Sequence, residues 1–239
     1  MPRCVIVGGA GISDYSRVNR YLRPDDFFIF CDGGFRHLAH LHAKPGLVVG
    51  DFDSWKESVN GPEVIPLPRE KDDTDTVFAA REAVRRGYND FLLIGAAGGR
   101  LDHTLGNLSL LLWLQARGKT ALLVDDYSDM EVVSSKEVLI GDSVSYFSLL
   151  NISGTARGVE ISGAKYPLRN GEISSDYQYG ISNEVLPGQT AAVSVREGNL
   201  LLIRVYRDPQ SEEEQELRQK EPSLCLTGAF SVYRSTDSR

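Results

Sequence analysis

Aspartate side chains gather in short motifs within the first 103 residues. GDFDS (50–54) places two aspartates directly after an apolar run, and KDDTDT (71–76) adds three more. CDGG (31–34) and GGRLDH (98–103) each add one aspartate, the second beside an arginine. Crowded carboxylates repel one another and lose solvation unless cations neutralise them. Because Mg²⁺ prefers a few carboxylates together with substrate phosphates, the pattern predicts a Mg²⁺ and phosphate site.

The same stretch of sequence supplies groups that could bind phosphate. GAAGGRLDH is a glycine-rich turn that leads into a predicted helix, whose free backbone N–H groups attract anions. Arg100 can hold phosphate through two parallel hydrogen bonds, and Lys71 can act as a point charge. His103 lies within the acidic motif and is included in the expected site.

Several of these residues also have a purely structural interpretation. A single aspartate after a strand often caps a turn, and Asp72 or Asp73 could be the N-cap of the following helix. The segment GGAG (8–11) is either a nucleotide contact or a tight turn, since its spacing is not that of a dinucleotide-binding loop. The histidines at 37, 40 and 42 fit core and surface positions better than a zinc site, because no cysteine lies near them.

Alternating strands and helices are expected to position these motifs. Periodicity predicts helices over 74–86 and 102–117, the second with Leu105, Leu108 and Leu112 on one face. Nearly continuous apolar runs, typical of parallel strands buried on both faces, end in Gly or Asp at 4–10, 27–34, 46–53, 91–99 and 120–126. This alternation predicts an α/β fold with a doubly wound, mostly parallel, Rossmann-like sheet. The acidic loops would then meet at the carboxyl ends of its strands.

The pattern of apolar and polar residues changes near residue 127. Short alternating runs separated by Gly, Asn, Asp and Pro predict a C-terminal antiparallel β-sandwich over 128–207. Residues 208–239 form a charged C-terminal extension whose structure and role the sequence does not define. We therefore expect an α/β domain over 1–127 that carries the metal and phosphate motifs, followed by the β-sandwich and the extension.

The composition of the sequence limits the classes of binding partner and the cellular compartment that fit it. A net charge of −7 argues against nucleic acid or an anionic membrane as the main partner, and it suits a cationic ligand or a phosphate ligand delivered with metal. Three scattered cysteines do not make a disulfide framework. The start of the sequence lacks a signal-like apolar segment, and no run reaches the ~18 apolar residues of a membrane span. These features favour a cytoplasmic protein.

The motifs taken together resemble a known enzyme family. CDGG, GDFDS, KDDTDT and GAAGGRLDHTLGN (95–107), followed by a β-rich half with GISNEV (180–185), are similar in order and spacing to the bacterial thiamine pyrophosphokinases. The resemblance covers about residues 1–207, and the extension departs from it. It implies transfer of the diphosphate of ATP to the hydroxyethyl group of thiamine, which gives thiamine diphosphate and AMP. It also implies a β-sandwich that binds thiamine and a homodimer with shared active sites.

Motif chemistry and the resemblance together give an expected set of site residues. Metal ligands would be Asp51, Asp53 and Asp75, and the catalytic residues Asp75, Asp102 and Arg100. The nucleotide site would use Asp32, Gly33, Lys71, Asp72, Thr76, Gly99, His103 and Asn107. Ser182 and Asn183 would face thiamine, beside Tyr177 and Tyr179.

Diphosphoryl transfer suits these residues because it needs alignment and charge neutralisation more than covalent chemistry. Either Asp75 or Asp102 could accept the hydroxyl proton. One rival is another Mg²⁺-dependent nucleotide diphosphotransferase or a phosphohydrolase with the same acidic site. A rival of another class is a nucleotide- or thiamine-binding regulatory module without catalysis. Release of AMP from ATP, with and without thiamine, separates them.

Overall fold

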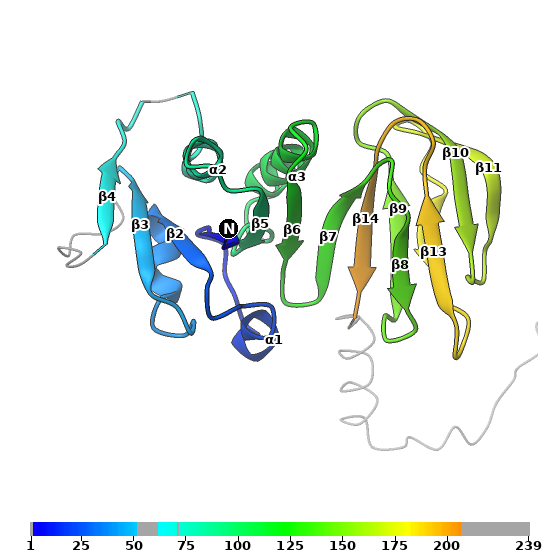
Figure 1. Ribbon diagram of the computed structural model, residues 1–239, viewed down its shortest axis with the longest axis horizontal. Helices are drawn as coiled ribbons and strands as arrows, with labels where there is room; N and C mark the ends of the chain where they lie inside the picture. Colours follow the sequence, from blue (N-terminus) through cyan, green and yellow to red (C-terminus); the bar gives the residue numbers. More distant parts are fainter. Residues whose placement is uncertain (1, 52–61, 71, 207–239) are drawn as a thin grey trace, which may run out of the picture. The chain divides into compact units, whose positions relative to one another are not determined.

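A computed structural model describes residues 2–51, 62–70 and 72–206 of the chain (Figure 1). The described residues form a ten-stranded mixed sheet and a separate four-stranded antiparallel sheet. Few helices accompany them, and those in the described residues all end by Gln115. The α/β class with a mostly parallel sheet, followed by an antiparallel β-sandwich, is confirmed.

Six parallel strands make up one part of the large sheet. In spatial order they are β6 (Thr120–Val124), β5 (Asp90–Ile94), β1 (Cys4–Val7), β2 (Phe27–Cys31), β3 (Pro45–Gly50) and β4 (Glu63–Pro66). The chain builds outward from β1 to β4 and then returns to the other side of β1 with β5. The strand order therefore reverses between β1 and β5, and ligands of open α/β sheets bind at such a switch point.

Both faces of the parallel strands are buried, as their continuous apolar sequences predict. One face packs beneath α2 (Asp75–Arg85) and α3 (Leu101–Gln115), with side chains such as Ile6 and Leu93 in the core. The other face packs against α1 (Tyr15–Asn19) and the 3₁₀ helix η1 (Asp32–His37), with Val7 and Phe30 in the core. Alternate residues of one strand thus enter opposite cores.

The strands end earlier than the apolar runs that predicted them. The run 91–99, for example, is a strand only as far as Ile94. Gly95, Gly98 and Gly99 then adopt positive φ angles of 58°, 91° and 66°, which take the backbone out of the sheet. The Gly and Asp residues at the ends of these runs therefore belong to the loops at the sheet edge.

Antiparallel strands continue the large sheet beyond β6. They are β7 (Ser128–Val133), β14 (Leu200–Val205), β9 (Tyr146–Leu150) and β12 (Gly180–Asn183), in that spatial order. Figure 1 labels the first three of them. The smaller sheet has the order β11 (Leu168–Ser174), β10 (Thr155–Ser162), β13 (Thr190–Ser194) and β8 (Val138–Gly141). Side chains from both sheets, Phe147 and Val193 among them, share one core. The expected division at residue 127 falls in the turn between β6 and β7, and the sheet runs through it.

The buried face of α3 differs from the sequence expectation. Leu105 is 54% exposed, and the buried residues of the helix are instead Asn107, Leu110, Leu111 and Leu114. Apolar residues surround this helix on nearly every side, so periodicity alone could not choose the face that packs on the sheet. The prediction that Leu105, Leu108 and Leu112 form the buried face was therefore wrong for Leu105.

Three short elements had no sequence prediction: α1, η1 and β4. The helix α1 has five residues and is capped by Asp14, whose side chain accepts a hydrogen bond from the Arg17 amide. The strand β4 is a four-residue edge strand with mostly exposed side chains. Elements this short carry too few residues for a periodic pattern.

The loops after β1 and β5 approach each other very closely. A Cβ atom placed on Gly8 would lie 2.4 Å from the carbonyl oxygen of Gly95, and one on Gly95 would lie 2.5 Å from the carbonyl oxygen of Gly8. Ala10 N–H donates to the Gly95 carbonyl at 2.8 Å. Glycine at both positions lets the two backbones meet at the switch point.

We expect Gly8→Ala to lower the free energy of unfolding by about 1–3 kcal/mol, because its new methyl group meets backbone that cannot move aside. Gly11→Ala is the matched control, since nothing lies within 4 Å of its Cβ position. Urea unfolding of both variants measures the difference. Equal stability of the two variants would contradict the close approach.

Candidate active site

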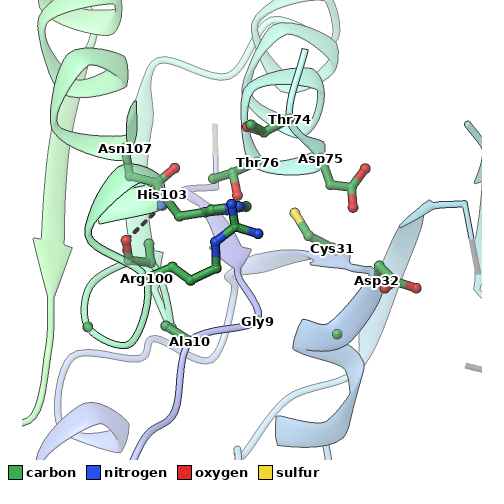
Figure 2. Close-up of a pocket in the computed structure, with 14 residues that line it drawn as sticks. Gly9, Ala10, Cys31, Asp32, Thr74, Asp75, Thr76, Arg100, His103 and Asn107 are labelled. Atoms are coloured by element: carbon green, nitrogen blue, oxygen red, sulfur yellow. Dashed lines mark hydrogen bonds between the residues drawn. The ribbon is translucent and has the colours of Figure 1, made fainter. Parts of the chain in front are cut away.

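A pocket of about 290 Å³ opens at the carboxyl ends of β1, β2 and β5 (Figure 2). Its walls come from the loops after these strands and from the first turns of α2 and α3. The lining residues are Gly9, Ala10, Cys31, Asp32, Gly33, Thr74, Asp75, Thr76, Gly95, Ala96, Gly98, Arg100, His103 and Asn107. The pocket therefore lies at the switch point of the sheet.

The N-terminus of α2 supplies two of the expected site residues. Thr74 is the N-cap, and its hydroxyl accepts a hydrogen bond from the Val77 amide at 3.4 Å. The alternative in which Asp72 or Asp73 caps the helix is therefore excluded, and Asp73 instead pairs with Arg81 at 2.6 Å. Asp75 and Thr76 follow the cap and line the pocket. Asp72 is exposed and does not line it.

Asp32 contributes a second carboxylate from the end of β2. In Figure 2 its side chain and that of Asp75 lie on the same side of the pocket, opposite Arg100. The end of β3 is adjacent, since a Cβ on Gly50 would lie 2.7 Å from the Cβ of Asp32. Asp51 follows directly and is half-buried. Asp53 and Lys71, also expected in the site, lie outside the described residues.

The glycine-rich turn before α3 is held from within the helix. Asn107 is buried, and its Nδ2 donates to the Ala96 carbonyl at 2.7 Å, the dashed line in Figure 2. The Gly98 amide donates to the Thr104 hydroxyl at 3.1 Å. Asn107 thus lines the pocket and also fixes the turn, although the sequence suggested only a contact near the nucleotide. Gly99 belongs to the same turn, but it does not line the pocket.

Arg100 and Asp102 form an exposed ion pair at the pocket. Two guanidinium nitrogens of Arg100 lie 3.1 and 2.5 Å from the Asp102 carboxylate oxygens. The hydrogen bond from Arg100, with one from the His103 amide, lowers the pKa of Asp102 to about 2. Arg100 and His103 line the pocket, and Asp102 does not. The carboxylate of Asp102 therefore orients the guanidinium from outside the pocket.

The loop after β1 forms a further wall, one for which the sequence left two interpretations open. Gly9 and Ala10 of the GGAG segment line the pocket. Arg36 of η1 donates to the Gly9 carbonyl, and Nε2 of His37 lies 2.9 Å from the Ala10 carbonyl. His37 is buried, and its Nδ1 lies 2.7 Å from the Tyr15 hydroxyl. These bonds give His37 a structural role, in line with the sequence interpretation of these histidines as core and surface side chains.

Ser182 and Asn183 lie elsewhere, on β12 at the far edge of the ten-stranded sheet. Asn183 is buried and binds the backbone of Tyr166 through both polar atoms, at 3.0 and 2.8 Å. Ser182 is exposed and has a φ of 55°, and its amide donates to the Ser148 hydroxyl. At about 4.8 Å between strands, β12 lies about 24 Å from β5. These residues therefore do not belong to the pocket of their own chain.

The residues at the pocket fit a magnesium ion that arrives with phosphates. Among residues 2–51, 62–70 and 72–206, no group of three or more His, Cys, Asp or Glu side chains forms a complete metal site. Mg²⁺ does not require one, since it is usually held by one or two carboxylates and by substrate phosphates. Asp32 and Asp75 supply two such carboxylates in one pocket.

The fold and the pocket define a class of protein in which an α/β sheet with a switch-point crevice continues into a β-sandwich. The family model "Thiamin pyrophosphokinase, catalytic domain" matches residues 18–123, and "Thiamin pyrophosphokinase, vitamin B1 binding domain" matches residues 136–200. The thiamine pyrophosphokinase of Bacillus subtilis is 28% identical over 207 residues, covering 83% of this chain and 96% of its own length.

Solved structures agree with these matches. The thiamin pyrophosphokinase of Geobacillus thermodenitrificans has a TM-score of 0.73 at 31% identity, over 87% of this chain and 98% of that one. The Bacillus subtilis enzyme has a TM-score of 0.75 at 27% identity, over 85% and 98%. The chain belongs to the thiamin pyrophosphokinase family.

Burial of His37 predicts that stability depends on pH. Burial lowers its pKa below the ordinary value of 6.5, so the unfolded chain binds a proton more readily. The contribution of His37 to stability is complete above about pH 6.5 and is lost as the pH falls below that value. The free energy of unfolding should therefore decrease between about pH 7.5 and 5.5. His37→Gln should flatten this slope, and the same replacement at exposed His42 is the control. Identical slopes in all three proteins would assign the pH dependence to other groups.

Proposed function

We propose that this chain catalyses transfer of the diphosphate of ATP to the hydroxyethyl group of thiamine. The observation that carries the proposal is the succession of two family matches, one over the α/β half with its switch-point pocket and one over the β-sandwich half. The comparisons give no support to a phosphohydrolase or another nucleotide diphosphotransferase.

The pocket has the groups that a nucleotide triphosphate requires. Arg100 offers a planar guanidinium for two parallel hydrogen bonds to phosphate, and the turn at Gly98 leads into the N-terminus of α3. Asp32 and Asp75, with Asp51 adjacent, would hold Mg²⁺ together with the phosphates. Bound there, Mg²⁺ would neutralise charge on the transferred group and on the departing AMP.

The reaction joins the thiamine hydroxyl oxygen to the β-phosphorus and breaks the bond between that phosphorus and the α,β-bridging oxygen. AMP departs with the electron pair, and the hydroxyl proton passes to a base. Asp102 is a poor base, because Arg100 occupies its carboxylate and lowers its pKa to about 2. Asp75 lines the pocket and is the better placed of the two candidates, provided that Mg²⁺ would bind one of its carboxylate oxygens and leave the other for the proton.

We propose that thiamine binds where two chains meet, in a homodimer. Leu101 and Leu105 are 71% and 54% exposed on the first turns of α3, next to the pocket-lining Arg100 and His103. Exposed aromatic and apolar side chains also occur close to Ser182 in the sequence, at Tyr177, Tyr179 and Ile181, and the exposed Tyr166 is bound by the neighbouring Asn183. Since β12 lies about 24 Å from β5 across the sheet, the second surface can complete the pocket of a partner more readily than its own. One self-complementary C₂ interface would build two such sites.

We propose a division of the chain into three segments and a cytoplasmic location. We assign residues 1–127 to nucleotide and metal binding, 128–207 to thiamine binding, and 208–239 to an extension of unassigned role. No helix in the described ranges combines the length and apolar character needed to cross a membrane. The proposed cytoplasmic location rests on the three scattered cysteines, which do not make a disulfide framework.

Activity should require Mg²⁺ or Mn²⁺ and the carboxylate of Asp75. Asp75→Asn keeps the side-chain shape but removes the charge, so we expect a loss of turnover of about 100-fold or more at saturating metal. Thiamine-dependent release of AMP measures it. Asp142→Asn is the control, an exposed aspartate in a turn of the β-sandwich half. Near-normal turnover in Asp75→Asn would remove Asp75 from the catalytic site.

Shared active sites predict recovery of activity in mixed dimers. Asp75→Asn disables the pocket, and Ser182→Arg places a cation on the exposed surface expected to face cationic thiamine. Each variant alone should be inactive. Mixed and allowed to exchange subunits, they should regain activity, because a mixed dimer contains one site with both parts intact. No recovery after demonstrated exchange would place each site within a single chain.

A further inference from the structure

The loop after β1, residues 8–14, is held at both of its ends. At its first end, Arg36, His37 and the Gly95 carbonyl bind the backbone of Gly9 and Ala10, as described above. At its second end, the loop is bound by the side chain of Asp126, which is 113 residues away in the sequence. Asp126 is the last residue of the apolar run 120–126, but it was not among the expected site residues.

Asp126 makes four hydrogen bonds to this loop. Its carboxylate accepts from the Ser13 amide at 3.0 Å through each oxygen, from the Asp14 amide at 2.9 Å and from the Ser13 hydroxyl at 2.6 Å. Asp14 is also the N-cap of α1, so the same contacts fix the start of that helix. A carboxylate that accepts several N–H and O–H donors binds more strongly than a neutral acceptor.

The turn that carries Asp126 is itself rigidly held. The neighbouring Asp125 accepts from the amides of Tyr127 and Ser128 at 2.9 and 2.6 Å, which closes the turn between β6 and β7. Nε of the buried Arg17 donates to the Asp125 carbonyl at 3.1 Å, which ties the turn to α1. Asp126 is therefore presented to the loop from a fixed backbone.

The held loop matters to the pocket because Gly9 and Ala10 form the wall that lies below Arg100 in Figure 2. Gly9 has no side chain and Ala10 has only a methyl group, so the wall consists mainly of backbone, and its position is that of the backbone. Gly9 has greater conformational freedom than other residues, so external contacts must supply the order. Loss of the contact at Ser13 and Asp14 would release one of the two ends.

We propose that Asp126 is a positioning residue that fixes the β1-loop wall of the pocket and so sets the affinity for the nucleotide. The proposal rests on the proposed function, since it assigns the pocket to ATP. Asp126 does not line the pocket and touches no substrate in this role. It acts only through the backbone of residues 9–14.

The test compares Asp126→Ala with a conservative and a distant variant. Asp126→Asn retains an oxygen for the two amides and an NH₂ group for the Ser13 hydroxyl, so it should rescue most of the function. Asp142→Ala is the matched control, an exposed aspartate that accepts from the Gly188 amide at 3.0 Å in a turn of the β-sandwich half. Affinity for a non-hydrolysable ATP analogue with Mg²⁺ is measured by calorimetry without thiamine, and steady-state KM values for ATP and thiamine are measured separately.

We expect Asp126→Ala to raise the analogue Kd and the ATP KM about tenfold, which corresponds to about 1.4 kcal/mol. The thiamine KM should change less than twofold, and Asp142→Ala should match wild type. Unchanged nucleotide affinity, or an equal rise in both KM values, would overturn the positioning role. If Asp126→Ala does not fold, Ser13→Ala decides by the same readouts, with a smaller rise expected. Wild-type protein that binds the analogue but never transfers to thiamine would overturn the proposed function alone.

Discussion

The close approach of two backbones at the switch point is the constraint on which the site depends. Gly8 and Gly95 meet there because neither carries a side chain, and the Ala10 amide completes the contact with the Gly95 carbonyl. This contact brings the ends of β1 and β5 together, and the pocket opens above it. The carboxylates after β2 and at the start of α2 gain their common orientation from the same parallel sheet.

Acidic and basic side chains lie on opposite sides of the pocket, and several of them form ion pairs. Asp32 and Asp75 lie on one side, while Arg100 lies on the other and is oriented by Asp102 from outside. Farther out, Asp73 pairs with Arg81 next to the N-cap of α2. Fixed partners of this kind keep flexible side chains near one geometry before a ligand arrives, which lowers the entropy lost on binding.

Sequence reasoning succeeded where local chemistry determines structure. The Gly and Asp residues at the ends of the apolar runs predicted where the loops at the sheet edge lie. The helical pattern from Thr74 to Arg86 corresponds to α2 within one residue at each end. Sequence reasoning did not predict the role of Asp126 at the end of the run 120–126, because its partner Ser13 is distant in sequence and is reached only through the turn between β6 and β7. Nor could it choose the buried face of α3, where Leu105 and Leu111 look equally apolar. Those features depend on tertiary packing, which no local pattern contains.

The unbroken sheet through β6 and β7 restricts how the protein can move. Many two-domain enzymes close on their substrates by a hinge in the connecting segment. Here the connection between the halves is a ladder of paired strands, with Leu122 opposite Glu131 and Val124 opposite Asp129. A hinge at this point would have to break backbone hydrogen bonds and expose buried strands. Adjustment to ligands is therefore expected in the surface loops rather than in a movement of one half of the chain against the other.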